Sequence, residues 1–300
     1  MINNVMLVGL GAIGCVYAKL IMENGNCNFY VPAKGERAEK IRKGFFVNGK
    51  KYIPGIADEQ NTPKADLLIF AVKNYQLEQA IEDVCRFVDK RTILIPFLNG
   101  ITARDEIKNA FPSNTVLYGV ALEIDALREG MNVVNSNDGI IEFGEAKNEL
   151  LTDEVKEVKG FFDKCGIANN VAADMKRSIW RKWMINVAAN QLSAVTGATD
   201  PQFMRIHELN NALHNVMREV INVAKKYGVD LSEKDIADYD EVLRNTKMES
   251  KTSMLQDIEA KRKTEVDYFA GTVMEYGKRV NVPTPYNELL YMLIKTLEKK

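Results

Sequence analysis

The sequence contains few of the residues that form zinc clusters or covalent cross-links. Its 300 residues include two histidines and four cysteines, and no two cysteines form a Cys-x-x-Cys pair. Zinc clusters and disulfide frameworks need closely spaced cysteine or histidine residues, so we expect neither, and no metal cofactor. The thiols are expected to be reduced and mostly structural; they are Cys15, Cys27, Cys85 and Cys165.

The sequence also lacks an excess of either charge and lacks long hydrophobic runs. It has 40 basic and 41 acidic residues, a net charge of -1, and no long basic block. This balance argues against a nucleic-acid partner. No run approaches the roughly 18 apolar residues that span a bilayer, and the N-terminus starts with a strand-like run rather than a basic leader. We expect a cytoplasmic protein that binds neither nucleic acid nor membrane.

Two kinds of sequence pattern divide the chain. Before residue 171, strand-like runs alternate with helical ones, and one hairpin is expected around Asn48-Gly49. From Met175 onward only helical patterns occur, over 175–196, 201–227, 232–245, 253–279 and 284–300. We therefore predict an α/β protein with a dinucleotide-binding domain of the Rossmann type over 1–171 and an all-α domain over 172–300 that carries the substrate and the catalytic residues.

A glycine-rich turn follows the first predicted strand. It reads Gly9-Leu10-Gly11-Ala12-Ile13-Gly14, between the apolar run Asn4–Val8 and a helical segment. Glycines with this spacing allow a tight turn, a close approach of the pyrophosphate, and close packing of helix on strand. We predict that these six residues bind a dinucleotide; the alternative is a glycine turn with no ligand.

The second predicted strand, Cys27–Val31, is not followed by the acidic residue that usually binds the ribose of NAD. Instead, the loop that follows carries Lys34 and Arg37, two cations suited to the 2'-phosphate of NADP. This favours NADP over NAD as the cofactor. The alternative is an ordinary solvated loop.

Two further predicted strands, Ala65–Val72 and Arg91–Leu98, end in polar residues. Lys73 follows the first and Asn99 the second. In open parallel sheets, ligands bind beyond the carboxyl ends of the strands, so both side chains are expected to face the cofactor or the substrate. For Lys73, a plain surface lysine is the alternative.

The predicted helix from Trp180 to Gly197 is mostly apolar but carries a polar row. Lys182, Asn186 and Asn190 are four residues apart, so they share one face. One interpretation is a structural seam that ties neighbouring helices together. The other is a site for a small, oxygen-rich anion, in which the ammonium supplies a charge or a proton.

Two later segments complete a pattern: Ser253-Met254-Leu255-Gln256-Asp257, and Thr264-Glu265-Val266-Asp267-Tyr268. Together with the glycine turn, Lys73, Asn99 and the row on the long helix, they resemble the ketopantoate reductase family. These are NADPH-dependent 2-dehydropantoate reductases of pantothenate and coenzyme A biosynthesis, and the resemblance covers nearly the whole chain. It implies a Rossmann domain followed by a helical domain like that of 6-phosphogluconate dehydrogenase, with the active site in the cleft between them.

The resemblance also implies roles for residues. Lys182 would be the catalytic proton donor, and Glu265 would position it. The substrate would be held by Asn99, Asn186, Asn190 and Ser253, while Lys73 and Asn99 would lie near the cofactor. Lys34 stands about where the family usually has arginine for the 2'-phosphate, and Leu98 where relatives often have glutamine or histidine.

Two other functions stay open: reduction of a different branched 2-oxo acid, and an NADP-binding sensor without chemistry. A homodimer is also compatible with the long helices.

The spacing of Ser253 and Glu265 makes a structural demand. They are twelve residues apart, which in one straight helix is about 18 Å, too far for one small acid to touch both. The segment Thr264–Asp267 matches a capping box, which marks a helix start. We therefore predict that the helical pattern over 253–279 breaks near Thr264.

Overall fold

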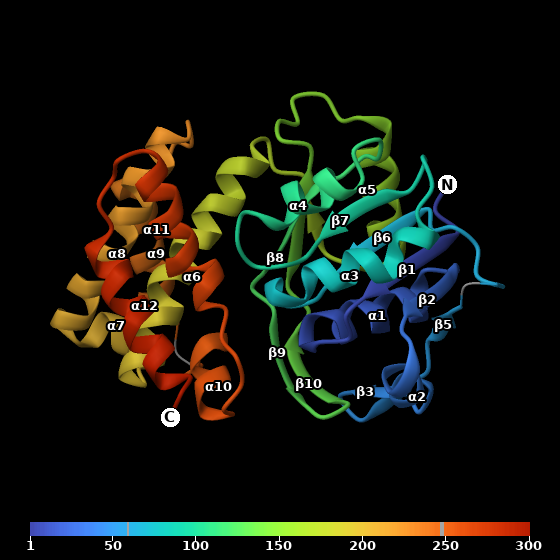
Figure 1. Cartoon of the computed structure of the whole chain (residues 1–300), viewed down its shortest axis with the longest axis horizontal. Helices are drawn as coiled ribbons and strands as arrows, with labels where there is room; N and C mark the ends of the chain where they lie inside the picture. The colour runs from blue at the N-terminus through green and yellow to red at the C-terminus, as the bar shows by residue number, and fades with distance from the viewer. Residues whose placement is uncertain (59, 247–248) are drawn as a thin grey trace. The chain divides into compact units, whose positions relative to one another are not determined.

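A computed structural model describes residues 1–58, 60–246 and 249–300. The chain divides into two compact units, Met1–Lys176 and Arg177–Lys300, and each is described by itself (Figure 1).

The first unit is built on a parallel sheet of five strands in the order β5-β2-β1-β6-β7. The strands are β1 (Asn4–Val8), β2 (Asn28–Pro32), β5 (Gly55–Ala57), β6 (Leu67–Phe70) and β7 (Ile93–Pro96). The chain leaves β1 toward β2 on one side and reaches β6 on the other, so the order reverses at β1. In open sheets this switch point is where ligands bind.

Helices cover both faces of this sheet. They are α1 (Ala12–Asn24), α2 (Gly35–Arg42), α3 (Leu77–Val84), α4 (Ala103–Ala110) and α5 (Asp153–Cys165). Alternate residues of β1 enter different cores: Val5 and Leu7 pack in the core that contains residues of α1 and α5, while Met6 and Val8 pack in the core that contains residues of α3 and α4. This alternation is the two-residue period of a strand buried on both sides.

Two smaller sheets complete the first unit, one in the order β4-β3-β10-β9 and one in the order β12-β11-β8. Their strands are β3 (Phe45–Val47), β4 (Lys50–Tyr52), β8 (Tyr118–Leu122), β9 (Asp125–Glu129), β10 (Asn132–Asn137), β11 (Ile140–Gly144) and β12 (Asn169–Asn170). The predicted hairpin is confirmed: Asn48 and Gly49 join β3 to β4 with φ of 48° and 81°, both in the left-handed region.

The second unit is helical. Its elements are α6 (Met175–Thr196), which begins at the end of the first unit, α7 (Gln202–Arg205), α8 (His207–Lys226), α9 (Glu233–Asn245), α10 (Ser253–Glu259), a 3-10 turn (Val266–Tyr268), α11 (Ala270–Arg279) and α12 (Pro285–Leu297). The helices α8, α11 and α12 pack against one another (Figure 1). The fold class predicted from the sequence is confirmed, and α6 ends as expected at Gly197, whose φ is 75°.

A buried carboxylate from α8 caps the start of α12. Glu219 accepts hydrogen bonds from the main-chain nitrogens of Tyr286 at 2.8 Å and Asn287 at 3.1 Å, and from Nδ2 of Asn287 at 2.7 Å. It therefore satisfies first-turn donors that no α12 residue satisfies.

The structure corrects one predicted helix and one predicted loop, and it confirms one predicted break. The pattern over 201–227 is two helices, because Ile206 takes an extended backbone with φ -105° and ψ 110°. The pattern over 253–279 is also broken, as predicted near Thr264, with α10 ending at Glu259 and α11 beginning at Ala270. The segment Pro32–Arg37 is only partly a loop, because α2 already begins at Gly35.

The capping box predicted at Thr264 is wrong. Its hydroxyl does accept a bond from the nitrogen of Val266, at 3.2 Å. The nitrogen of Thr264, however, donates to Glu298 rather than to Asp267. The carboxylate of Glu298, the residue after α12, thus takes the place of the local one.

Candidate active site

The glycine turn after β1 has two glycines that the fold requires and one that it does not. Gly9 has a φ of 105°, and a Cβ there would lie 2.5 Å from the carbonyl oxygen of Ala71. A Cβ on Gly14 would lie 1.9 Å from the carbonyl oxygen of Gly9. At Gly11 the nearest atom would be 3.8 Å away, an ordinary contact. Packing therefore does not require a glycine at position 11. The lack of a side chain there fits the close approach of a pyrophosphate.

The start of α1 suits the same ligand. Its N-cap residue is Gly11, which has no side chain to cap the first amides, and its first turn contains no acidic residue. A helix start of this kind presents N–H groups and the positive end of the helix dipole to an anion. The predicted residues Gly9, Leu10, Gly11, Ala12, Ile13 and Gly14 therefore form a turn and helix start that fit a dinucleotide.

Lys73 and Asn99 lie at the same edge of the sheet. Phe70 of β6 pairs with Pro96 of β7, and each of the two polar residues comes three positions later. Nδ2 of Asn74 donates to the carbonyl oxygen of Asn99 at 2.8 Å, which joins the two loops. Both Lys73 and Asn99 are half-buried, so their side chains keep partial access to solvent.

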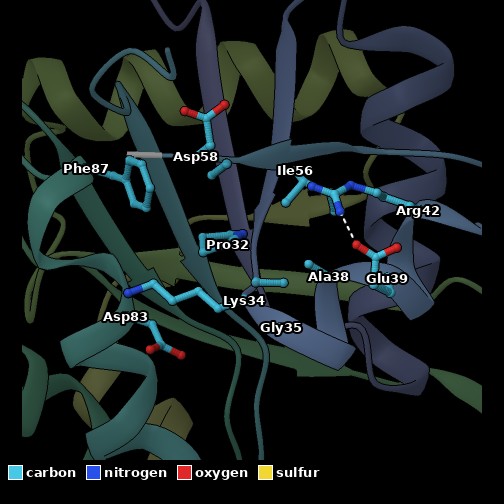
Figure 2. A pocket seen from close by; sticks show the side chains of 12 residues that line it. Pro32, Lys34, Gly35, Ala38, Glu39, Arg42, Ile56, Asp58, Asp83 and Phe87 are labelled. Atoms are coloured by element: carbon cyan, nitrogen blue, oxygen red, sulfur yellow. Dashed lines mark hydrogen bonds and ion pairs between the residues drawn. The ribbon is translucent and has the colours of Figure 1, made fainter. Parts of the chain in front are cut away.

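A hollow of about 360 Å³ lies beyond the ends of β2 and β5 (Figure 2). Its charged lining residues are Lys34, Glu39, Arg42, Asp58 and Asp83. Arg42 forms an ion pair with Glu39 across the same face of α2. The sequence suggests Arg37 as the second cation, but the lining contains Arg42 instead. Residues 35, 38, 39 and 42 lie on one face of α2, and Arg37 lies on another face. With two cations and three carboxylates, this lining does not distinguish NADP from NAD.

The polar row on α6 carries a lysine with an unusual acidity. Burial lowers the pKa of the Lys182 ammonium to about 8, while the nearby negative charge of Glu265 acts in the opposite direction. Glu265 itself is buried, with 3% of its surface exposed. An ammonium with a pKa near neutrality is suited to proton transfer.

Asn190, at the end of the row, is joined to Ser253. Its amide oxygen accepts a hydrogen bond of 3.0 Å from the Ser253 hydroxyl and one of 3.1 Å from the nitrogen of Met254. Both bonds fall on the oxygen, so they leave the two N–H groups of the amide for other partners. Asn186 lies one turn nearer to Lys182 and is half-buried. The second unit thus brings Asn190 and Ser253 together, and Lys182 and Glu265 together.

The structural-seam interpretation holds for part of this helix. Asn190 ties α10 to α6 by the bonds just described, and the Ser193 hydroxyl donates to the carbonyl oxygen of Ala198 at 2.6 Å. The two tryptophans of this helix, Trp180 and Trp183, pack against each other with ring centres 5.3 Å apart. His214 contacts Asp240 at 3.0 Å, also a structural role.

Sequence reasoning missed Glu298 and the indole nitrogen of Trp183, which hold the segment that carries Glu265. The nitrogen of Thr264 donates to Glu298 at 2.8 Å, and Nε1 of Trp183 donates to the carbonyl oxygen of Tyr268 at 3.1 Å. Glu298 stands 34 residues from Thr264, and no local pattern connects them.

Within the described residues, no three histidine, cysteine or acidic side chains gather as a metal site would need. No described helix is long and apolar enough to cross a membrane. All four cysteines are free, and burial raises the pKa of the Cys15 thiol to about 11, so that thiol stays protonated.

A parallel sheet with a glycine turn suited to a dinucleotide, in a chain that also holds a buried lysine near a carboxylate, is the combination expected of a dinucleotide-dependent oxidoreductase. Comparison with known proteins narrows the class. Residues 5–148 match the family model "Ketopantoate reductase PanE/ApbA", and residues 174–298 match its C-terminal counterpart. The chain belongs to the ketopantoate reductase family.

Two curated relatives illustrate the distance to known proteins. The chain is 26% identical over 300 residues to the uncharacterized oxidoreductase YkpB of Bacillus subtilis, covering 98% of both. It is 24% identical over 310 residues to a 2-dehydropantoate 2-reductase of Streptococcus pyogenes, covering 98% of this chain and 97% of the relative.

Among solved structures, the fold matches D-mandelate dehydrogenase in its ternary complex with NADH and anilino(oxo)acetate, with a TM-score of 0.88, 22% identity, and coverage of 99% and 98% of the two chains. It also matches a dimeric ketopantoate reductase of Staphylococcus aureus, with a TM-score of 0.82, 18% identity and 99% coverage of both.

Proposed function

We propose that the protein reduces 2-dehydropantoate to (R)-pantoate with NADPH, a step of pantothenate and coenzyme A biosynthesis. The observation that carries the proposal is the Lys182 ammonium, whose pKa is lowered to about 8 by burial while Glu265 acts to retain its proton. Family membership supports it, because relatives such as the Streptococcus pyogenes protein are 2-dehydropantoate 2-reductases.

The chemistry follows from the charge that forms during reduction. NADPH, when bound, supplies a hydride to the carbonyl carbon of the 2-oxo acid. Negative charge then develops on the carbonyl oxygen, where the Lys182 ammonium stabilises it and donates a proton. Glu265 keeps that ammonium charged and oriented. Asn99, Asn186, Asn190 and Ser253 would hold the carboxylate and the hydroxyl of the substrate.

The cofactor would be bound by the domain of residues 1–171. The helical domain would comprise residues 172–300. The glycine turn Gly9–Gly14 would hold the pyrophosphate, and Lys34 would face the 2'-phosphate. Lys73 and Asn99 would lie near the reacting end. The mixed charge beside Lys34 supports only a moderate preference for NADPH over NADH.

A second candidate is reduction of another 2-oxo acid by the same lysine mechanism. Leu98 is buried directly before Asn99, where the family often has a polar residue, so this part of the chain is more apolar than in such relatives. The fold match with D-mandelate dehydrogenase adds an aryl 2-oxo acid to those worth testing. A silent NADP sensor is less well supported, because it has no use for a lysine and carboxylate pair. By analogy with the Staphylococcus aureus enzyme, a homodimer is the assembly to test.

The test is NADPH oxidation with 2-dehydropantoate, 2-oxoisovalerate and phenylglyoxylate, for the wild type and Lys182→Ala. We expect fast turnover of 2-dehydropantoate, a loss of about 100- to 10,000-fold in kcat for the variant, and retained NADPH binding. The exposed Lys226→Ala is the matched control and should retain full activity. Fast turnover of another acid instead would reassign the substrate, and tight NADPH binding without any turnover would favour the sensor.

A further inference from the structure

The position of Glu265 is not fixed by a helix of its own. It lies on the segment 264–268, between the end of α10 and the start of α11, where the only regular structure is the 3-10 turn Val266–Tyr268. The carbonyl oxygen of Glu265 accepts hydrogen bonds from the nitrogens of Tyr268 and Phe269, which sets the local turn, but these bonds do not fix the turn relative to the neighbouring helices. What holds this segment therefore decides where the Glu265 carboxylate stands.

The strongest contact comes from Glu298, just after the last residue of α12. One of its carboxylate oxygens accepts two bonds from Thr264, at 2.8 Å from the nitrogen and 2.7 Å from the hydroxyl. Thr264 is 1% exposed, so these bonds are shielded from water. They immobilise the residue directly before Glu265.

Two side chains of α12 itself hold the other side of Glu265. The Tyr291 hydroxyl donates to Asp267 at 2.9 Å, and Lys295 lies 3.3 Å from Asp267 and 3.1 Å from Glu298. Positions 291, 295 and 298 are four and three residues apart, so they share one face of the helix. That face contacts residues on both sides of Glu265.

The same segment is also tied to α6. Nε1 of Trp183 donates to the carbonyl oxygen of Tyr268 at 3.1 Å, and Trp183 is the residue after Lys182. The segment is thus held between α6, which carries the lysine, and α12. A displacement at either end would change the separation of Lys182 and Glu265.

We propose that Glu298 is a positioning residue: by fixing Thr264 it holds Glu265 against Lys182, and so sets the orientation and charge of the proton donor. The inference rests on the proposed role of Lys182. Charged groups near Glu265 in the chain or in space include Lys182 on α6, Lys263 and Asp267 in the flanking chain, and Lys295 and Glu298 at the end of α12. Of these, Lys182 is the group whose charge responds to the position of Glu265.

Glu298 stays charged under working conditions. Burial alone would raise its pKa, but the hydrogen bonds from Thr264 and the contact with Lys295 outweigh burial and hold the pKa below its usual range. A permanent carboxylate can accept both bonds from Thr264 at once.

The test compares Glu298→Ala with Glu298→Gln, and with Glu288→Ala as a matched control on the exposed part of α12. In Glu298→Ala we expect kcat to fall about 10- to 100-fold with little change in KM for NADPH. The basic limb of the pH–rate profile should move to lower pH, because a displaced Glu265 no longer supports the charge of Lys182. Glu298→Gln keeps an oxygen for Thr264 and should lie close to the wild type.

A merely structural role would reduce the active fraction without moving the pH limb. An unmoved limb in Glu298→Ala therefore overturns the proposal. Equal shifts in the alanine and glutamine variants also overturn it, since they would show a through-space effect of charge instead of positioning. If Glu298→Ala does not fold, Thr264→Val removes one of the two bonds and should shift the limb in the same direction by less.

A second readout does not depend on turnover. Competitive labelling with acetic anhydride, followed by mass spectrometry, reports the pKa of individual lysines, with the exposed Lys226 as internal reference. We expect Glu298→Ala to lower the pKa of Lys182 in this assay. If no 2-oxo acid is reduced but the pKa of Lys182 still falls in Glu298→Ala, the proposed function fails and the positioning role stands. If turnover is present but neither the pH limb nor the pKa of Lys182 changes, only the positioning role fails.

Discussion

The amide oxygen of Asn190 accepts a hydrogen bond of 3.0 Å from the hydroxyl of Ser253. The same oxygen accepts a hydrogen bond from the main-chain nitrogen of Met254, so one side chain of α6 holds the start of α10. A residue expected to bind substrate therefore also supports the fold. The two roles separate by mutation.

Asn190→Ala should lower stability and weaken substrate binding. It leaves the buried nitrogen of Met254 without its acceptor, which costs about 1–3 kcal/mol in the free energy of unfolding. Ser253→Ala leaves that bond in place and should cost less than about 1 kcal/mol, yet raise KM for the 2-oxo acid. Urea unfolding and initial rates measure both effects. An unchanged KM in Ser253→Ala would remove the hydroxyl from the substrate site.

The rate of reduction should fall as pH rises through the pKa of Lys182, about 8. The sign follows from the role, because only the protonated ammonium can donate a proton. The profile of kcat/KM against pH should therefore be flat near pH 6.5 and lose about tenfold per pH unit well above 8. In Glu265→Gln the midpoint should move to lower pH, since the carboxylate acts to raise the pKa of Lys182. A midpoint near 10 would contradict the assignment.

The three glycines of the dinucleotide turn should respond differently to alanine. At Gly11 the added methyl meets no close atom, so the protein should fold normally but bind NADPH about tenfold more weakly or worse. At Gly14 the methyl would lie 1.9 Å from a carbonyl oxygen, and unfolding should become easier by about 1–3 kcal/mol or more. Thermal unfolding and fluorescence titration distinguish the cases. Normal NADPH affinity in folded Gly11→Ala would place the pyrophosphate elsewhere.

Cofactor preference should depend on the ion pair of Glu39 and Arg42. Glu39→Gln removes a carboxylate from the hollow and frees Arg42, so the ratio of kcat/KM for NADPH to that for NADH should rise several-fold. Arg42→Gln should lower that ratio. Arg37→Gln, on the same helix but outside the lining, is the control and should leave it unchanged. If all three variants have the same ratio of kcat/KM for NADPH to that for NADH, the side chains of α2 do not contact the 2'-phosphate.

The carboxylate that caps α12 should make stability depend on pH. Burial raises the pKa of Glu219 above its usual value, despite the hydrogen bonds from Tyr286 and Asn287. Its contribution to stability is therefore present below the unfolded pKa and lost as pH rises through the folded pKa. Relative to Glu219→Gln, the wild type should become less stable as pH rises above the ordinary glutamate pKa of about 4.3. Urea unfolding at several pH values measures the difference, and a constant difference would contradict the shift.

Local chemistry explains which features the sequence predicts well. The turn at Asn48-Gly49, the glycine turn after β1 and the stop at Gly197 depend on backbone angles that glycine or asparagine favours. The polar row of α6 depends on helical spacing alone. The family resemblance predicted Lys182 and Glu265 as partners, and the structure places their charges within reach of each other.

Long-range partners explain what the sequence does not predict. The break near Thr264 can be predicted from the local sequence. The carboxylate that accepts the Thr264 nitrogen, however, belongs to Glu298 and not to Asp267. Arg42 lines the hollow because α2 begins at Gly35, inside a segment that looks like a loop. The extended backbone of Ile206 has no local signal, since no proline or glycine interrupts the pattern there.

The helix α12 is anchored at both ends, by Glu219 at its start and by the bonds between Glu298 and Thr264 at its end. Anchors at both ends make fraying from either terminus cost more free energy. The amides of α12 and those of residues 264–268 should therefore exchange with deuterated solvent as one cooperative group. Protection of the amides around Glu265 would then rise and fall with the opening of α12.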